Sequence, residues 1–195
     1  MPASERRATI LEAALQTFAL RGYDGAPMDE IAAAAGVSKA VVYDHVASKR
    51  ELYTELLQSI QADLETVVER ALEPLGSGGA ERVHAAIAAF YGYVEEHPAA
   101  SRLLFLELQS AAVSPFGLEL EQRVVDEIAG ALGDLGVFER HPDRVCRLQM
   151  LAELVRSGIQ GLASWWFRHP EASREQLVEC TVALVWPAIE RARAG

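Results

Sequence analysis

The stretch from Met28 to Val46 constrains the fold of this chain most strongly, because it predicts two short helices joined by a tight turn. Apolar residues in its first part recur at an i, i+3, i+4, i+7 spacing, which places them on one helix face. They are Met28, Ile31, Ala32 and Ala35. Gly36 then ends this helix, since glycine adopts the left-handed conformation found at helix C-termini. Ser38 is suited to cap the next helix. The pattern predicts a helix-turn-helix.

The second helix of this motif has an inward and an outward face. Val42 and Val46 lie four residues apart and share the inward side. The outward residues are Lys39, Ala40, Tyr43 and Asp44. Lys39 suits a phosphate or a guanine, and the Tyr43 phenol suits a phosphate. Asp44 either accepts from a cytosine amino group or points aside. The outward face is therefore expected to enter a major groove of DNA.

The run from Gly22 to Leu57 resembles the DNA-binding domain of the TetR family of bacterial transcriptional regulators. The matching residues are Gly22-Tyr23, Ile31-Ala32, Ala35-Gly36-Val37-Ser38, Tyr43-Asp44-His45, Ser48-Lys49 and Leu52. This resemblance covers about the first quarter of the chain. It implies that DNA is contacted by Ser38, Lys39, Ala40, Tyr43, His45 and Lys49.

The net charge of −10 is unevenly distributed along the chain. From Met1 to Tyr53 six basic residues stand against seven acidic ones, so the remaining −9 lies after Tyr53. Both lysines of the chain, Lys39 and Lys49, lie in or beside the predicted helix-turn-helix. A nearly neutral head with locally placed cations can bind a duplex while an acidic body turns away from it.

The remainder of the chain is predicted to be helical. A first helix is expected from about Ser4 to Leu20, and a long fourth helix from its cap at Ser48 to about Leu72. Later helices are expected at Val83–Val94, Ala99–Leu108, Phe116–Leu132, Pro142–Phe167 and Glu171–Ala192. The expected fold is all-α, with a three-helix helix-turn-helix DNA-binding domain at 1–47 and a helical ligand-binding and dimerisation domain at 48–195.

Two surfaces of the second domain are candidates for binding. Gly158 and Gly161 permit close helix approach, and the last helix carries a stripe of apolar and small residues. Both features are expected to form a two-fold interface between two copies of the chain. The interface residues are expected to be Gly158, Gly161, Leu177, Thr181, Leu184 and Ala188. The family resemblance implies an effector pocket, and its candidate lining is Phe90, Tyr93, Phe105, Gln109, Phe116, Gln160, Trp165 and Trp166. The same aromatic residues are equally consistent with ordinary core packing. Many apolar side chains and few cations favour a lipophilic effector that is uncharged or cationic.

The sequence offers no pattern for a metal or a cofactor. His97, His141 and His169 each precede a proline at expected helix boundaries, and no pair of them shares the i, i+3 or i, i+4 spacing of helical metal ligands. Cys146 and Cys180 form no metal-binding motif and are expected to be reduced and buried. No apolar run approaches the roughly 18 residues of a membrane span, and the N-terminus lacks a signal-peptide core. We therefore expect a cytoplasmic protein.

These features together predict a homodimeric transcriptional regulator, in particular a repressor, that binds a palindromic operator in double-stranded DNA and is released by a lipophilic small molecule. An α-helical enzyme or lipid carrier is a second class, and the stretch Arg156 to Gly161 is not the G-x-S-x-G elbow that would support it. A DNA-architectural protein is a third class, which the acidic body fits poorly.

Overall fold

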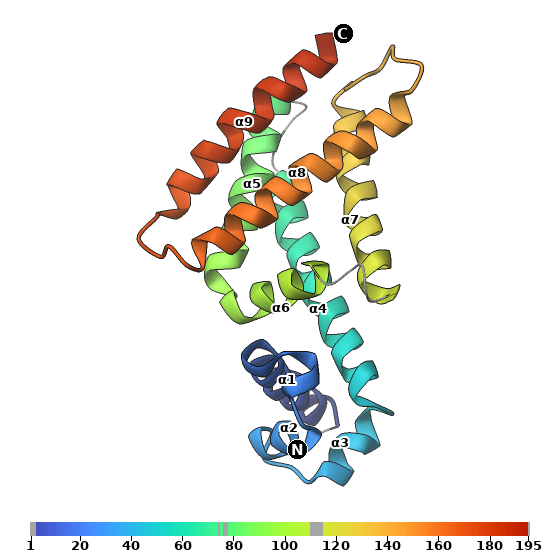
Figure 1. The fold of residues 1–195 in the computed structure, drawn as a ribbon, viewed down its shortest axis with the longest axis vertical. Coiled ribbons are helices and arrows are strands. Elements are labelled where there is room, and N and C mark those ends of the chain that lie inside the picture. Colours follow the sequence, from blue (N-terminus) through green and yellow to red (C-terminus); the bar gives the residue numbers. More distant parts are fainter. Residues whose placement is uncertain (1–2, 74, 76–77, 110–114, 195) are drawn as a thin grey trace. The chain divides into compact units, whose positions relative to one another are not determined.

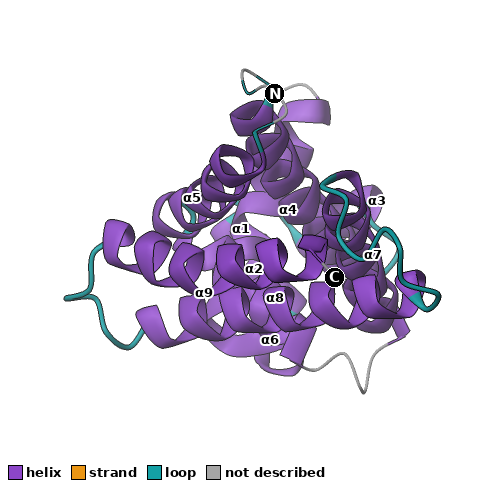
Figure 2. Ribbon diagram, turned by 90° about the horizontal axis from the view of Figure 1, so that it is seen from above, coloured by secondary structure: helices purple, strands orange, loops and turns teal. Residues whose placement is uncertain are grey.

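The computed structural model describes residues 3–73, 75, 78–109 and 115–194 of the chain. Within these residues the secondary structure consists of helices, with no strand (Figure 1 and Figure 2). The helices are α1 (Ala3–Gly25), α2 (Met28–Ala34), α3 (Lys39–His45), α4 (Lys49–Leu72), α5 (Gly79–Glu96), α6 (Pro98–Gln109), α7 (Pro115–Asp134), α8 (Arg144–Trp166) and α9 (Arg174–Ala194). Every helix expected from the sequence is present, and the all-α prediction is confirmed.

The chain divides into two compact units. The first unit contains the described residues up to Leu64 together with His97–Leu106. The second contains Glu65–Glu96 together with the described residues from Glu107 onward. Because α4 supplies residues to both units, we call α1, α2, α3 and the part of α4 up to Leu64 the head.

Local signals in the sequence account for the turns of the head. Gly36 has φ +68°, the left-handed conformation that the turn between α2 and α3 requires. Ser38 is the N-cap of α3, and its Oγ accepts a hydrogen bond from the Val41 N–H at 3.3 Å. Gly22 interrupts α1 with φ 69° and ψ 174°, so the chain bends there before the extended Pro27 leads into α2. The helix-turn-helix is therefore present as predicted.

Two reciprocal side-chain hydrogen bonds cap the N-terminus of α4. The Ser48 Oγ accepts from the Glu51 N–H at 3.1 Å, and the Glu51 carboxylate accepts from the Ala47 N–H. This reciprocal arrangement is a capping box, which satisfies backbone donors that the first turn of a helix leaves unpaired. It confirms Ser48 as the cap and fixes the angle at which the chain passes from α3 into α4.

The core of the head is built from apolar side chains of all four helices. Ile10, Phe18, Ile31, Val42 and Leu52 are essentially inaccessible to solvent. Each such side chain contributes roughly 1.5 to 3 kcal/mol through burial. An aromatic group of three rings closes one side of this core, with Phe18 and Tyr53 edge to face at 5.0 Å and Tyr23 4.9 Å from Tyr53.

The second unit is a bundle in which α7 packs against α8 and α5 packs against α9 (Figure 1). One apolar cluster includes Val125 and Leu132 of α7, Leu148 of α8 and Ile189 of α9. A buried hydrogen bond joins α5 to α9, with the Tyr91 hydroxyl 3.0 Å from the Thr181 Oγ1. Burial is the main cause that raises the pKa of Tyr91, so its hydroxyl stays protonated.

Candidate nucleic-acid interface

The outward face of α3 is formed by side chains that the fold leaves in solvent. We call Ser38, Lys39, Ala40, Tyr43 and Asp44 the recognition face, and all of them are exposed. Tyr43 retains 43% exposure although it is a large aromatic residue, whereas its neighbour Val42 is completely buried. The buried side chains of Val42 and Val46 thus fix one side of α3 in the core of the head. The residues of the recognition face lie together on its other side.

Lys39 is held in place by a carboxylate of the preceding helix. Its Nζ lies 3.0 Å from the Oδ2 of Asp29 on α2. The hydrogen bond to Asp29, followed by the charge of Asp29, raises the pKa of Lys39, so the ammonium is charged at neutral pH. No pattern in the sequence marked Asp29 as a partner of Lys39. It stands ten residues before Lys39, on the preceding helix of the motif.

Lys49 is also engaged inside the head. Its Nζ donates to the backbone carbonyl of Asp24 at 3.3 Å and lies 4.8 Å from the centre of the Tyr23 ring. The latter distance is within the range of a cation–π contact. Lys49 and His45 are both half-buried, unlike the exposed residues of the recognition face, and Lys49 is the first residue of α4.

Arg7 ties three helices of the head together. Its guanidinium binds both carboxylate oxygens of Glu55 on α4, at 2.8 and 2.6 Å, and donates to the backbone carbonyl of His45 at 3.1 Å. Such a two-pronged contact is stronger and more directional than a single hydrogen bond. The end of α3 is thereby fixed to both α1 and α4. No local pattern predicts this contact, because Arg7 and Glu55 are 48 residues apart.

The candidate effector residues differ in burial and in their neighbours. Tyr93, Phe105 and Gln160 are buried, while Phe90 is half-buried and packs edge to face on Tyr91 at 5.3 Å. The side chains of Gln109 and Phe116 lie outside the described residues. Phe105 belongs to the first unit and the other described candidates to the second.

Trp165 and Trp166 differ in their surroundings. Trp165 is 37% exposed and stacks on His169 at 4.1 Å, so its ring lies at the surface of α8 and does not line an interior pocket. Trp166 packs edge to face on Tyr91 at 6.2 Å, and its Nε1 donates to the Ala172 carbonyl at 2.8 Å. The expectation that both indoles face one cavity is wrong for Trp165, because neighbouring positions on a helix point in different directions.

Gln160 is part of a polar network centred on an arginine that the sequence analysis did not identify. The Arg156 Nη1 donates to the Gln160 Oε1 at 2.7 Å, and the Arg156 Nη2 pairs with Glu121 at 2.6 Å and Glu153 at 2.7 Å. The Arg156 side chain is only 9% exposed. The hydrogen bond from Arg156 is the main cause that lowers the pKa of Glu153. This network joins α7 to α8.

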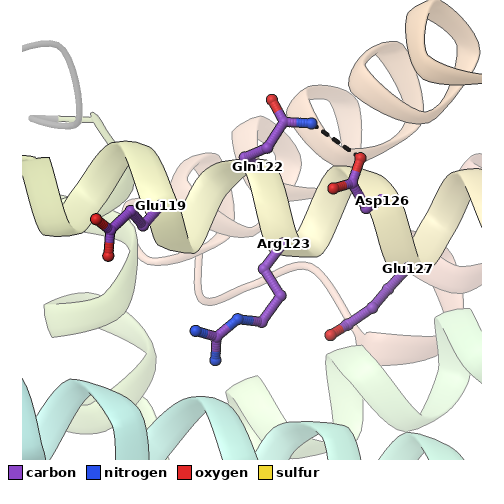
Figure 3. Close-up of a pocket in the computed structure, with 5 residues that line it drawn as sticks. All are labelled: Glu119, Gln122, Arg123, Asp126 and Glu127. Carbon is purple, nitrogen blue, oxygen red and sulfur yellow. Dashed lines mark hydrogen bonds between the residues drawn. The ribbon is translucent and has the colours of Figure 1, made fainter.

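Two grooves lie elsewhere on the described surface. A shallow groove of about 570 Å³ runs along α7, lined by Glu119, Gln122, Arg123, Asp126 and Glu127 (Figure 3). Gln122 donates to Asp126 at 2.9 Å across one helical turn. Burial, then the charges of Glu65 and Glu69 on α4, raise the pKa of Glu127. No predicted effector residue lines this groove or a second one between α7 and α8.

The expected interface residues fall into two groups. Leu184 is 72% exposed, Gly158 and Gly161 are exposed, and Ala188 is half-buried. Leu177 and Thr181 are buried within this chain, and Thr181 binds Tyr91 of α5. The last two therefore cannot lie on an exposed face of α9, because that side of the helix packs on α5.

The expectation that Cys146 and Cys180 are buried is wrong, because both lie on exposed positions of their helices. Within the described residues, no group of three His, Cys, Asp or Glu is placed to hold a metal ion. No helix described here is both long and apolar enough to cross a bilayer.

An all-α chain that presents the second helix of a helix-turn-helix on its surface has the architecture of a DNA-binding regulator. Residues 10–56 match the sequence model of the family described as bacterial regulatory proteins, tetR family. The chain is also 35% identical over 193 residues to the HTH-type transcriptional activator FasR of Mycolicibacterium smegmatis. The aligned region covers 95% of this chain and 84% of FasR. The chain belongs to the TetR family. It is a DNA-binding transcriptional regulator, and its relatives are not enzymes.

Other relatives agree with this assignment. The chain is 31% identical over 124 residues to the transcriptional repressor KstR2 of Mycobacterium tuberculosis, covering 62% of this chain and 60% of KstR2. The solved structure described as the ketosteroid transcriptional regulator KstR2 superposes with a TM-score of 0.69 at 23% identity, covering 94% of both chains. A TetR-like regulator from Rhodococcus sp. RHA1 superposes with a TM-score of 0.79 at 22% identity, covering 97% of this chain and 98% of that one. At these identities the structural matches establish the fold.

Proposed function

We propose that the protein is a homodimeric repressor that binds a palindromic operator through the recognition face and is released by a lipophilic small molecule. The recognition face carries the proposal, because Lys39 and Tyr43 stand exposed one helical turn apart above the buried Val42. Two such faces related by a two-fold axis read half-sites one helical turn of DNA apart. The protein would act in the cytoplasm, where its operator is.

An exposed apolar stripe supports the proposed dimer. Along α8, the exposed residues Met150, Leu154, Gly158, Gly161 and Trp165 recur every three to four positions and so lie on one side of the helix. Among the described residues, a Cβ built at Gly158 or Gly161 meets no atom within 4 Å apart from its chain neighbours and the backbone of its own helix. Packing within the chain therefore does not require these glycines, and they leave room for a second helix to approach closely. Leu184 of α9 adds a further exposed apolar side chain.

The proposed effector and the proposed repression have support from relatives. KstR2 is named as a repressor and as a ketosteroid regulator, which favours a lipophilic effector here. FasR is named as an activator, so the sign of regulation needs a direct measurement. The groove along α7 is lined by charged and polar side chains and is a poor match for a lipophilic molecule.

The proposal is tested by selecting duplexes from a randomised pool with the full chain. Recovery of an inverted repeat is expected, together with reduced expression of a reporter gene placed behind it. Addition of a ketosteroid is expected to weaken binding in a gel shift. Recovery of a single, non-repeated site would contradict the dimeric reading, and increased reporter expression would contradict repression.

A further inference from the structure

The ion pair between Lys39 and Asp29 lies within the proposed DNA contact. Lys39 is in the first turn of α3 and Asp29 in the first turn of α2, and their charged atoms are 3.0 Å apart across the motif. Their side chains are 49% and 70% exposed. A phosphate oxygen of DNA can therefore reach the same ammonium that the carboxylate already holds, and the two anions compete for it.

Because the side chains of Lys39 and Asp29 are exposed, Asp29 and a DNA phosphate bind the Lys39 ammonium with similar strength. An exposed ion pair changes an equilibrium constant by roughly two- to fivefold, which is similar to one exposed contact with a phosphate. A phosphate on unrelated DNA therefore gains little by displacing Asp29. Guanine in the major groove differs, because its N7 and O6 offer a lysine two adjacent acceptors in one place. Such a site draws Lys39 away from Asp29 where a lone phosphate does not.

We propose that Asp29 weakens binding to unrelated DNA by holding Lys39 away from its phosphates, and that Lys39 leaves Asp29 at the operator. This inference rests on the proposed contact between Lys39 and the operator. Asp29 itself needs no contact with DNA, so it is a positioning residue that acts through Lys39.

A second ion pair between exposed side chains of the head provides a matched control. Arg21 of α1 pairs with Glu30 of α2 at 2.7 Å, and both side chains are exposed. Glu30 lies in the same first turn of α2 as Asp29. Glu30→Gln therefore removes the same charge from the same turn while leaving the Lys39–Asp29 pair intact.

The experiment compares Asp29→Asn, Glu30→Gln and the wild-type chain on random-sequence duplexes and on a duplex from the randomised-pool selection, across a range of salt concentrations. For Asp29→Asn we expect roughly two- to fivefold tighter binding to random duplexes. We also expect a slope of log affinity against log salt that is steeper by about one for each bound head, since one more phosphate is neutralised. Binding to the selected duplex should tighten by a similar factor, because Lys39 no longer has to leave Asp29 there. The salt slope on the selected duplex should stay unchanged, since Lys39 contacts a guanine there and neutralises no additional phosphate. Glu30→Gln should leave the affinity and the salt slope unchanged on both duplexes, because Arg21 is not among the residues expected to contact DNA.

Lys39→Ala separates this inference from the role of Lys39 itself. If Asp29 acts through Lys39, the double variant Asp29→Asn/Lys39→Ala binds random duplexes with the salt slope of Lys39→Ala alone. An unchanged affinity of Asp29→Asn for random duplexes, or an unchanged salt slope on them, would overturn the inference. A Lys39→Ala variant that binds the selected duplex as tightly as the wild type would instead remove the proposed contact on which the inference rests.

Discussion

Lys39 and Tyr43 are expected to contribute to DNA affinity and little to folding, since the fold leaves both side chains in solvent. The double variant Lys39→Ala/Tyr43→Ala should abolish specific duplex binding in a gel-shift titration. Its Tm should fall by no more than a few degrees, because exposed positions usually change the free energy of unfolding by less than about 0.5 kcal/mol. Arg140→Ala/Gln149→Ala, which removes the same charge from exposed positions of the second unit, should bind normally. Unchanged affinity in the first variant would remove α3 from the reading role.

Glu127 is expected to lower stability at neutral pH. Its pKa is raised by burial and by Glu65 and Glu69, so the folded state binds the proton more readily than the unfolded chain does. Proton binding by Glu127 therefore favours the folded state fully below the pKa of Glu127 in the unfolded chain. This stabilisation is lost as the pH rises through its raised pKa in the folded state. Glu127→Gln should therefore raise the Tm at pH 7 by about 1 °C, and this gain should disappear toward about pH 4. Glu119→Gln, on the same helix, serves as the control, and a gain that persists in acid would contradict the assignment.

Single residues were predictable where their partners are close in sequence. Gly36 and Ser38 act through backbone groups a few positions away, so the residue types alone indicate the turn and the cap. Arg7 and Arg156 were missed because each binds an acidic residue on another helix, and nothing local marks which one. Trp165 was misplaced for a related reason, since an aromatic residue next to a buried one can still point outward.

At the scale of elements, α4 is an unbroken helix of 24 residues with neither glycine nor proline inside it. We expect it to carry the effector signal to the head, since Leu52 and Leu56 near its start are buried in the head core. Gln58→Gly/Ser59→Gly should soften this helix at two exposed positions while sparing the buried Leu57. Each glycine costs roughly 1 kcal/mol of helix stability. DNA binding without effector should persist, and the effector should lose much of its effect on DNA affinity.

Gln58→Ala/Ser59→Ala is the matched control for this helix, because alanine keeps it stiff at the same positions. Titrations of DNA affinity with and without effector compare the two variants. A coupling of 1 to 3 kcal/mol is typical for such linkage, so a loss of about half is measurable. Full release of DNA from the double-glycine variant at saturating effector would show that the signal takes another route.

Helix positions were predictable because apolar periodicity is strong in each segment, whereas the sides that face inward were less so. The last helix shows this best, since one expected stripe contained both Leu177 and Leu184. Leu177 is buried and Leu184 is exposed. A helix with apolar residues on two sides has two candidate inner faces, and only the packing of α5 on α9 selects one.

At the scale of the whole molecule, the exposed apolar residues of α8 and α9 predict self-association. Leu184→Glu would place an unpaired charge in the proposed contact, at a cost of several kcal/mol, on the order expected for a buried ion without a partner. The variant should be monomeric in light scattering and should bind DNA weakly, while its helix content remains that of the wild type. Leu118→Glu, on an exposed leucine of α7, should remain dimeric. A wild-type chain that is monomeric at micromolar concentration would contradict the dimer.

The pair between Lys39 and Asp29 also bears on how fast a regulator finds its site on a chromosome. Proteins reach their sites partly by sliding along unrelated sequence, and every ammonium bound to a passing phosphate lengthens each stay there. Under the proposed role of Asp29, Lys39 remains bound to its own carboxylate during this search, so stays on the wrong sequence are shorter and more sites are sampled in the same time. An acidic side chain in a DNA-binding head, which would be expected to hinder binding, would thereby serve the speed of the search.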